Sequence, residues 1–181
     1  MDNLRDYIQV YDDILDKETC EAIVKRFEEE KQLQTIESEI YKFDQLNVSK
    51  ADNWKEQNDT LSDLAFSAAT AYFNDVNVPL IPELKGFEEI RIKRFRPDQN
   101  ERFELHVDVN MYMSAKRFLT VYCFLNSPEG GGEIYFPTLD LSIKPRAGRV
   151  AVFPPMWMFP YEIQKPASNN SYLVGTYLHY M

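Results

Sequence analysis

The chain contains the stretch Phe103-Glu104-Leu105-His106-Val107-Asp108, in which one residue separates a histidine from an aspartate. On an extended strand, residues i and i+2 project from the same face, so the two side chains can reach one point about 2 Å from each donor atom. His106 and Asp108 are therefore candidate metal ligands, and the alternative is a satisfied polar pair. As ligands they would supply two thirds of the 2-His-1-carboxylate triad that holds non-haem Fe(II).

Around this stretch the hydrophobic pattern has a period of two, which is typical of strands. The predicted strands are separated by turns rich in Pro, Gly and Asn, and such a series favours a sandwich or jelly roll. They cover residues 88–95, 105–111, 118–125, 132–136, 141–144, 149–153 and 172–180.

The first half of the chain has a helical period instead. We predict a helix over residues 16–32, capped by Asp16, and a second over residues 60–74, capped by Asp59 or Thr60. The weakly periodic residues 37–57 are expected to form a long loop beside the site. The predicted organisation is one structural domain, with a helical lead over residues 1–86 packed on a barrel core over residues 87–181.

Composition narrows the function classes. The chain has 181 residues, a formal net charge of −9 and a pI near 4.8, which argues against a nucleic-acid or anionic-membrane surface. Cys20 and Cys123 have no CxxC spacing, so we expect two free thiols. No apolar run is long enough for a bilayer, and the N-terminus has no apolar signal segment, so we expect a cytoplasmic protein.

Over residues 94–180 the sequence resembles the prolyl 4-hydroxylase-like branch of the Fe(II)/2-oxoglutarate oxygenases. The matching stretches are residues 103–108, 117–126, 129–136, 145–155 and 171–178, in the order found in that family. The resemblance implies a mainly β, α+β fold, a double-stranded β-helix of the jelly-roll or cupin-like type with N-terminal helices buttressing one sheet. It also implies Fe(II), 2-oxoglutarate and hydroxylation of a prolyl peptide or free amino acid. So compact a chain resembles stand-alone bacterial or phage-encoded members.

The same comparison places other residues where the family carries its polar groups. Tyr161 stands at the position of the distal histidine, and Ser171 at that of the Lys or Arg that grips 2-oxoglutarate. Phe124 stands where some relatives have a tyrosine, with Thr120 on the same strand. These departures make the binding of 2-oxoglutarate doubtful.

Several side chains are candidates to fill these roles. Tyr161 is a candidate third metal ligand and catalytic residue, although it would need a deprotonated phenol. Arg117 is our candidate catalytic residue and replacement anchor for a carboxylate, because it opens the strand beside the metal pair. Thr120, Phe124 and Ser171 complete the predicted cofactor site. Further candidate cations are Arg94, Arg149 and Lys165, and His179 is expected to be a strand-end surface residue too distant to complete the triad.

Three functions stay open at this point. The first is a degenerate family member that works as a binding or structural module, with a small-molecule or peptide ligand. The second is a non-classical metal-dependent oxidoreductase that uses His106 and Asp108. The third is an active 2-oxoglutarate-dependent hydroxylase, a non-haem iron dioxygenase. A homo-oligomer is compatible with all three.

Overall fold

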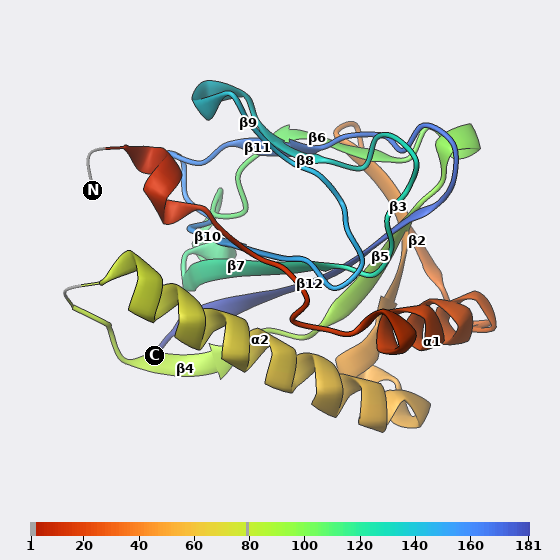
Figure 1. Cartoon of the computed structure of the whole chain (residues 1–181), viewed down its shortest axis with the longest axis horizontal. Helices are drawn as coiled ribbons and strands as arrows, with labels where there is room; N and C mark the ends of the chain where they lie inside the picture. Colours follow the sequence, from red (N-terminus) through yellow and green to blue (C-terminus); the bar gives the residue numbers. More distant parts are fainter. Residues whose placement is uncertain (1–2, 79) are drawn as a thin grey trace.

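The computed structural model describes residues 3–78 and 80–181. Three residues lie outside it, namely Met1, Asp2 and Pro79. The first two belong to the N-terminal segment in which no signal sequence is predicted. The described residues form a 12-stranded antiparallel sheet that curls into a nearly closed barrel, with two α-helices against one side. This confirms the predicted double-stranded β-helix with buttressing helices. In Figure 1 the helices lie beneath the layer that contains β7, β10 and β12.

The hydrogen-bonded order of the strands is β1-β10-β7-β12-β5-β3-β6-β11-β8-β9, with β2 attached to β3 and β4 attached to β12. The elements of the first half are β1 (Gln9–Tyr11), α1 (Lys17–Glu28), β2 (Gln34–Glu37), β3 (Tyr41–Asn47), α2 (Lys55–Val76) and β4 (Leu84–Phe87). Those of the second half are β5 (Arg91–Phe95), β6 (Arg102–His106), β7 (Arg117–Phe124), β8 (Ile134–Phe136), β9 (Leu141–Ile143), β10 (Val150–Phe153), β11 (Tyr161–Ile163) and β12 (Ser171–Tyr180).

Both predicted helices are present, with one boundary to correct. Asp16 caps α1 as predicted, because its Oδ1 accepts a hydrogen bond of 2.8 Å from the Thr19 amide. The second helix begins at Lys55 rather than near Thr60, after a short 3₁₀ turn that buries Trp54. Burial of that indole anchors the extra turn, so tertiary packing overrides the local capping signal at Asp59 and Thr60.

The prediction of a loop over residues 37–57 is wrong, because this segment contains β3. This strand pairs with both β5 and β6 and joins the two layers of the barrel. Its alternation is obscured by Asp44, whose carboxylate is buried on the helix side in an ion pair of 2.6 Å with Arg94 on β5. A buried charge paired in this way behaves as an interior residue although its type predicts exposure.

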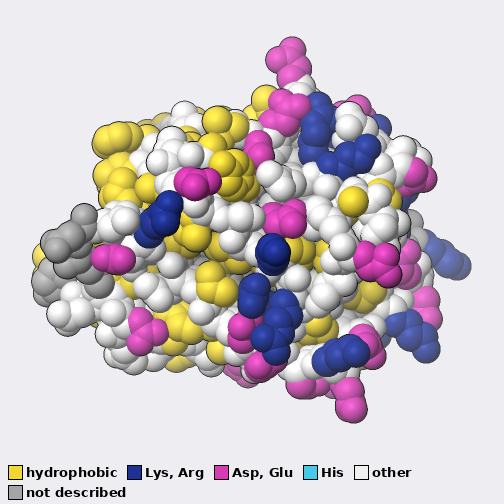
Figure 2. Space-filling view, turned by 45° about the horizontal axis from the view of Figure 1, so that its top comes forward, with side chains coloured by type: hydrophobic (Ala, Val, Ile, Leu, Met, Phe, Trp, Pro, Cys, Tyr) yellow, Lys and Arg dark blue, Asp and Glu magenta, His cyan; other side chains and the backbone are white. Residues whose placement is uncertain are grey.

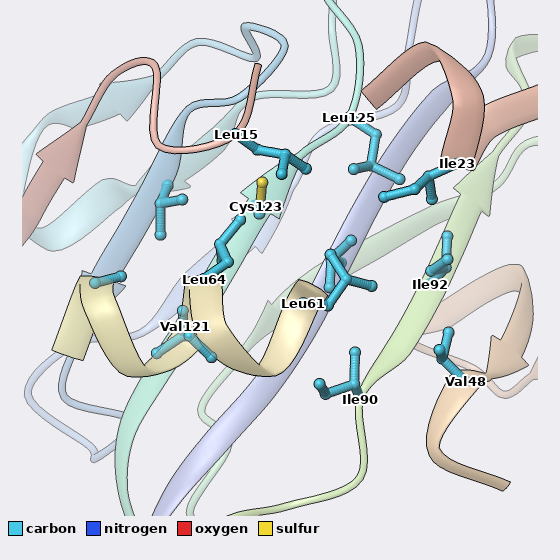
Figure 3. Packing of buried hydrophobic residues seen from close by; sticks show 14 of the residues in the cluster. Leu15, Ile23, Val48, Leu61, Leu64, Ile90, Ile92, Val121, Cys123 and Leu125 are labelled. Atoms are coloured by element: carbon cyan, nitrogen blue, oxygen red, sulfur yellow. The ribbon is translucent and has the colours of Figure 1, made fainter. Parts of the chain in front are cut away.

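Alternate residues of the central strands separate two cores. On the helix side, Leu61 and Leu64 of α2 pack against Val121 and Cys123 of β7, as Figure 3 shows. On the inner side the barrel is filled mainly by aromatic rings, including those of Phe95, Phe124, Phe136, Phe153 and Tyr161. The site residues described below belong to this inner side.

The two cysteines are free thiols, as predicted, and both lie in the helix-side core. Cys20 is 0% exposed and Cys123 is 1% exposed. Burial raises the pKa of Cys20 to about 11 and that of Cys123 further still. Neither thiol is a reactive nucleophile in the folded protein.

In Figure 2 acidic and basic side chains are interspersed on the face shown, so neither sign dominates it. In residues 3–78 and 80–181, no helix is both long and apolar enough to cross a membrane.

Candidate functional site

His106 and Asp108 meet at the end of β6, as the sequence predicts. His106 Nε2 lies 3.7 Å from Asp108 Oδ1, and both side chains are almost completely buried. The His106 ring stacks on Phe103 with a centroid separation of 3.6 Å. Its Nδ1 lies 2.7 Å from the Glu104 carbonyl oxygen, so Nδ1–H donates there and the Nε2 lone pair is left without a partner.

The Asp108 carboxylate is surrounded by hydroxyl donors. Tyr177 donates to Oδ1 at 2.8 Å, Thr120 donates to Oδ2 at 3.0 Å, and Tyr161 lies 3.0 Å from both oxygens. Burial alone would raise the pKa of this carboxyl group, but the hydrogen bond from the Tyr177 hydroxyl and the positive charge of Lys93 contribute to holding its pKa below the usual value. Asp108 is therefore a buried, ionised acceptor that takes hydrogen bonds from three hydroxyl groups.

A third tyrosine completes this network. The Tyr122 hydroxyl lies 2.8 Å from that of Tyr161 and 3.2 Å from that of Tyr177. Because Tyr161 and Tyr177 each give their single proton to Asp108, Tyr122 is left as a donor, and its own single proton can go to only one of them at a time. Burial, and then the Asp108 charge, raise the pKa of both Tyr161 and Tyr177 well above 10. All three phenols are therefore protonated at neutral pH.

One glycine makes room for this cluster. Gly175 on β12 lies opposite Tyr122 on β7, and a Cβ added at this glycine would lie 2.6 Å from Tyr122 Cε1. That separation is well inside van der Waals contact, so the ring of Tyr122 lies directly on the backbone of β12. The sequence pattern did not single out Tyr122, Tyr177 or Gly175, since all three lie inside apolar runs.

Tyr161 occupies the cross-strand position beside His106, which supports the alignment that places it where the family has its distal histidine. β11 pairs with β6 so that Tyr161 lies opposite His106, with ring centroids 4.4 Å apart. Its protonated hydroxyl points to Asp108 and offers no negative charge to a cation. Together His106, Asp108 and Tyr161 thus supply two metal donors and a phenol.

This donor set does not fit the Fe(II) facial triad. Fe(II) would need the third position filled by an imidazole or an anion, and would compete with three hydroxyls for the Asp108 oxygens. In the part of the chain that is described, no group of three or more His, Cys, Asp and Glu side chains is arranged to hold a metal ion.

The predicted cofactor residues do not share one surface. A cavity of about 270 Å³ opens beside His106 and Asp108, and Arg117 lines it, whereas Thr120, Phe124 and Ser171 do not. Phe124 and Ser171 are each 1% exposed, and Phe124 belongs to the aromatic core of the barrel. The polar role of Thr120 is its hydrogen bond to Asp108.

Arg117 is held by groups of the protein itself. It forms a two-point ion pair with Glu88, at 2.8 and 3.0 Å, and donates to the Asp108 carbonyl oxygen at 3.1 Å. Its guanidinium lies 3.9 Å from the centre of the Tyr177 ring. His179, predicted to lie at the surface, is instead buried, with Nε2 3.1 Å from the same Glu88. These contacts assign Arg117 to the wall of the cavity.

The other candidate cations point elsewhere. Arg94 projects to the helix side, where it binds Glu28 and Asp44, and Arg149 pairs with Asp12 at 2.7 Å. Lys165 is exposed. The cation inside the barrel is Lys93 on β5, which the sequence reasoning missed. Lys93 shares its side of the strand with Phe95, and this parity was the signal that could have found it.

Comparison with solved structures confirms the predicted fold and its resemblance to prolyl hydroxylases. A viral collagen prolyl hydroxylase from Paramecium bursaria Chlorella virus-1, solved with 2-oxoglutarate, superimposes with a TM-score of 0.74 at 18% identity over 97% of each chain. A Pseudomonas putida prolyl-4-hydroxylase gives 0.71 at 17% identity, over 97% of this chain and 93% of the other. At such identities the likeness establishes the fold alone.

Two further comparisons give a similar likeness. A Trichoplax adhaerens prolyl hydroxylase bound to a hypoxia inducible factor peptide gives a TM-score of 0.74 at 15% identity, over 96% of this chain and 84% of the other. In sequence, a mimivirus protein named "Putative prolyl 4-hydroxylase" is 32% identical over 77 residues, 38% of this chain and 32% of the viral protein. The match thus spans about a third of that relative's length. No protein-family model matches the chain.

Proposed function

We propose that this protein is a ligand-binding member of the prolyl hydroxylase fold that does not hydroxylate a substrate with Fe(II) and 2-oxoglutarate. The observation that carries the proposal is the Tyr161 hydroxyl, which donates to Asp108 at the cross-strand position beside His106. A protonated phenol there replaces a metal donor and also occupies the carboxylate that would bind the metal.

The two other replaced positions support the same function. Ser171 offers no positive charge to the far carboxylate of 2-oxoglutarate, and an unpaired carboxylate buried there would cost several kcal/mol. Phe124 offers no hydroxyl on the neighbouring strand. Aromatic rings fill the inner barrel, and the open cavity is lined by His106 but by neither Phe124 nor Ser171.

An anaerobic titration with Fe(II) and 2-oxoglutarate tests the proposal. We expect no metal-to-ligand charge-transfer band for the natural chain, because neither a complete triad nor a carboxylate anchor is present. Micromolar binding of both together, with succinate formed in the presence of a prolyl peptide and dioxygen, would overturn the proposal.

The double variant Tyr161→His with Ser171→Lys is the matched comparison. It places an imidazole beside His106 and a cation at the start of β12. It also removes the Tyr161 hydroxyl, one of the three hydrogen-bond donors to Asp108. We expect it to bind Fe(II) and 2-oxoglutarate more tightly than the natural chain. Equal affinities would mean that these two positions are not the reason for the loss.

One observation favours a second candidate, a metal site that uses His106 and Asp108 alone. The Nδ1–H bond to the Glu104 carbonyl is the arrangement that orients many metal-binding histidines, and it leaves Nε2 available. In this case the metal content of the purified protein should fall in the variant His106→Ala. An unchanged metal content would remove this candidate.

A further inference from the structure

Lys93 is a buried ammonium group that makes no direct contact with a carboxylate among the described residues. Its residue is only 7% exposed, yet its Nζ takes part in no ion pair or side-chain hydrogen bond found in that part of the chain. Three aromatic rings surround Nζ instead, with the centres of Phe43, Phe103 and Tyr122 at 5.2, 5.4 and 5.2 Å. Cation–π contacts compensate only part of the lost hydration of an ammonium group.

The other charged groups at the cavity are already paired. Arg91 binds Glu89 at 2.5 Å, and Arg117 binds Glu88 at two points. Asp108 accepts from three hydroxyls, as described above. Lys93 is thus the cation in this wall whose charge is not met by a direct carboxylate contact.

A second polar atom without a hydrogen-bond partner belongs to His106, which also lines this cavity. His106 Nε2 is buried without a hydrogen-bond partner, and because Nδ1 carries the ring proton, Nε2 is an acceptor. Both His106 and Lys93 line the cavity of about 270 Å³. Tyr41, Phe43 and Phe103 supply aromatic walls, and Ile36 and Ile40 supply aliphatic ones.

We infer that this cavity binds a small monocarboxylic acid with a flat or compact apolar body and one hydroxyl or N–H group. Its carboxylate pairs with Lys93 Nζ, its donor group bonds to His106 Nε2, and its body lies against the aromatic walls. The inference deepens the proposed function by naming the class of ligand and rests on it. The anchor differs from the Ser171 position that the resemblance indicates, since Lys93 comes from β5.

The probes are the three isomers of hydroxybenzoate, with benzoate and hydroxybenzamide as references, titrated calorimetrically into the whole chain in the presence of a metal chelator. We expect at least one hydroxybenzoate to bind with a Kd below about 1 mM, and its neutral amide to bind at least tenfold more weakly. The isomer that binds best reports the spacing between the two polar anchors.

Two variants assign the anchors. Lys93→Met should weaken hydroxybenzoate binding at least tenfold, whereas Lys165→Met, which removes an exposed positive charge elsewhere, should not change it. His106→Ala should lower the affinity for hydroxybenzoate to that for benzoate and leave benzoate binding unchanged.

The inference is overturned if no hydroxybenzoate binds the natural chain, if the amide binds as well as the acid, or if Lys93→Met binds as well as the natural chain. The comparison of acid with amide uses the natural chain, so it decides the matter even where a variant does not fold. Lys93-dependent binding together with an iron charge-transfer band would leave the ligand assignment intact and overturn only the absence of turnover.

Discussion

The two faces of the central strands carry different kinds of side chain. On the helix side of β5, β7 and β12 the buried residues are largely aliphatic and contact α1 and α2, as with Ile92, Val121 and Val174. On the inner side the same strands carry rings, hydroxyls and charges, among them Lys93, Tyr122 and Tyr177. The helix side therefore supplies the aliphatic packing of the fold, and the inner side supplies the polar groups of the candidate site.

The largest effect is expected on the helix side. Leu61 is 1% exposed between α2 and the sheet, so Leu61→Ala should lower the free energy of unfolding by about 3 kcal/mol, through lost burial and the cavity left behind. Phe66→Ala on the same helix is the control, because Phe66 is 68% exposed and should change stability by less than about 0.5 kcal/mol. Urea unfolding measures both, and equal losses would contradict the assignment of this face as the core.

On the inner side, Lys93→Met should stabilise the protein by up to about 3 kcal/mol at pH 7. Burial lowers the pKa of Lys93 from 10.5 to about 8, and each pKa unit corresponds to about 1.4 kcal/mol. If the variant is more stable but no longer binds the ligand, then Lys93 serves binding at the expense of stability.

The difference in the free energy of unfolding between Lys93→Met and the natural chain should depend on pH. Between pH 8 and 10.5 the unfolded chain holds a proton on Lys93 that the folded chain has lost, so the stability of the natural chain rises there relative to the variant. The advantage of Lys93→Met is therefore full below pH 8 and shrinks toward pH 10.5. A difference that does not change with pH would contradict the buried charge as its cause.

Gly175→Ala should lower the free energy of unfolding by about 2 kcal/mol. The added Cβ would collide with Tyr122 and force its ring out of the hydroxyl cluster. Gly130→Ala is the matched control, because its Cβ would meet Ala167 at an ordinary 3.4 Å. Thermal unfolding compares the two. A loss at Gly175 that persists in a Tyr122→Leu background would mean that the ring is not the obstacle.

The smallest effect is expected for Tyr161→Phe, which should lower the free energy of unfolding by about 1 kcal/mol at pH 7. The reason is that one hydroxyl donor to the ionised Asp108 is lost. The folded pKa of Asp108 lies below its usual value, so this contribution is present above about pH 4 and disappears as the pH falls through the folded pKa. Tyr112→Phe, at a residue 91% exposed, should have no measurable effect. A cost for Tyr161→Phe that stays constant into acid would show that it comes from packing alone.

The period of two made the fold predictable where one face of a strand is apolar. It predicted β5, β7, β10 and β12, and the resemblance placed His106, Asp108 and Tyr161 together. It failed at β3, where Asp44 is buried by an ion pair with Arg94, a partner 50 residues away that no local pattern contains.

The remaining site residues depend on tertiary packing. Lys93 lies between Ile92 and Arg94 in a strand buried on both faces, so residue type alone does not tell which side chain points inward, and the candidate cations included Arg94 but not Lys93. Tyr122 and Tyr177 were hidden for a related reason, because their rings count as apolar in a pattern while their hydroxyls form the network around Asp108.

The two buried thiols between the helices and the sheet can report how often the helices separate from the sheet. Cys20 on α1 and Cys123 on β7 are sealed into the same layer, so an alkylating reagent can reach them only when the helices separate from the sheet. The rate of thiol labelling therefore measures how often that layer opens, independently of anything bound in the barrel. A ligand that fills the inner cavity without slowing the labelling would show that the two sides of the sheet move separately.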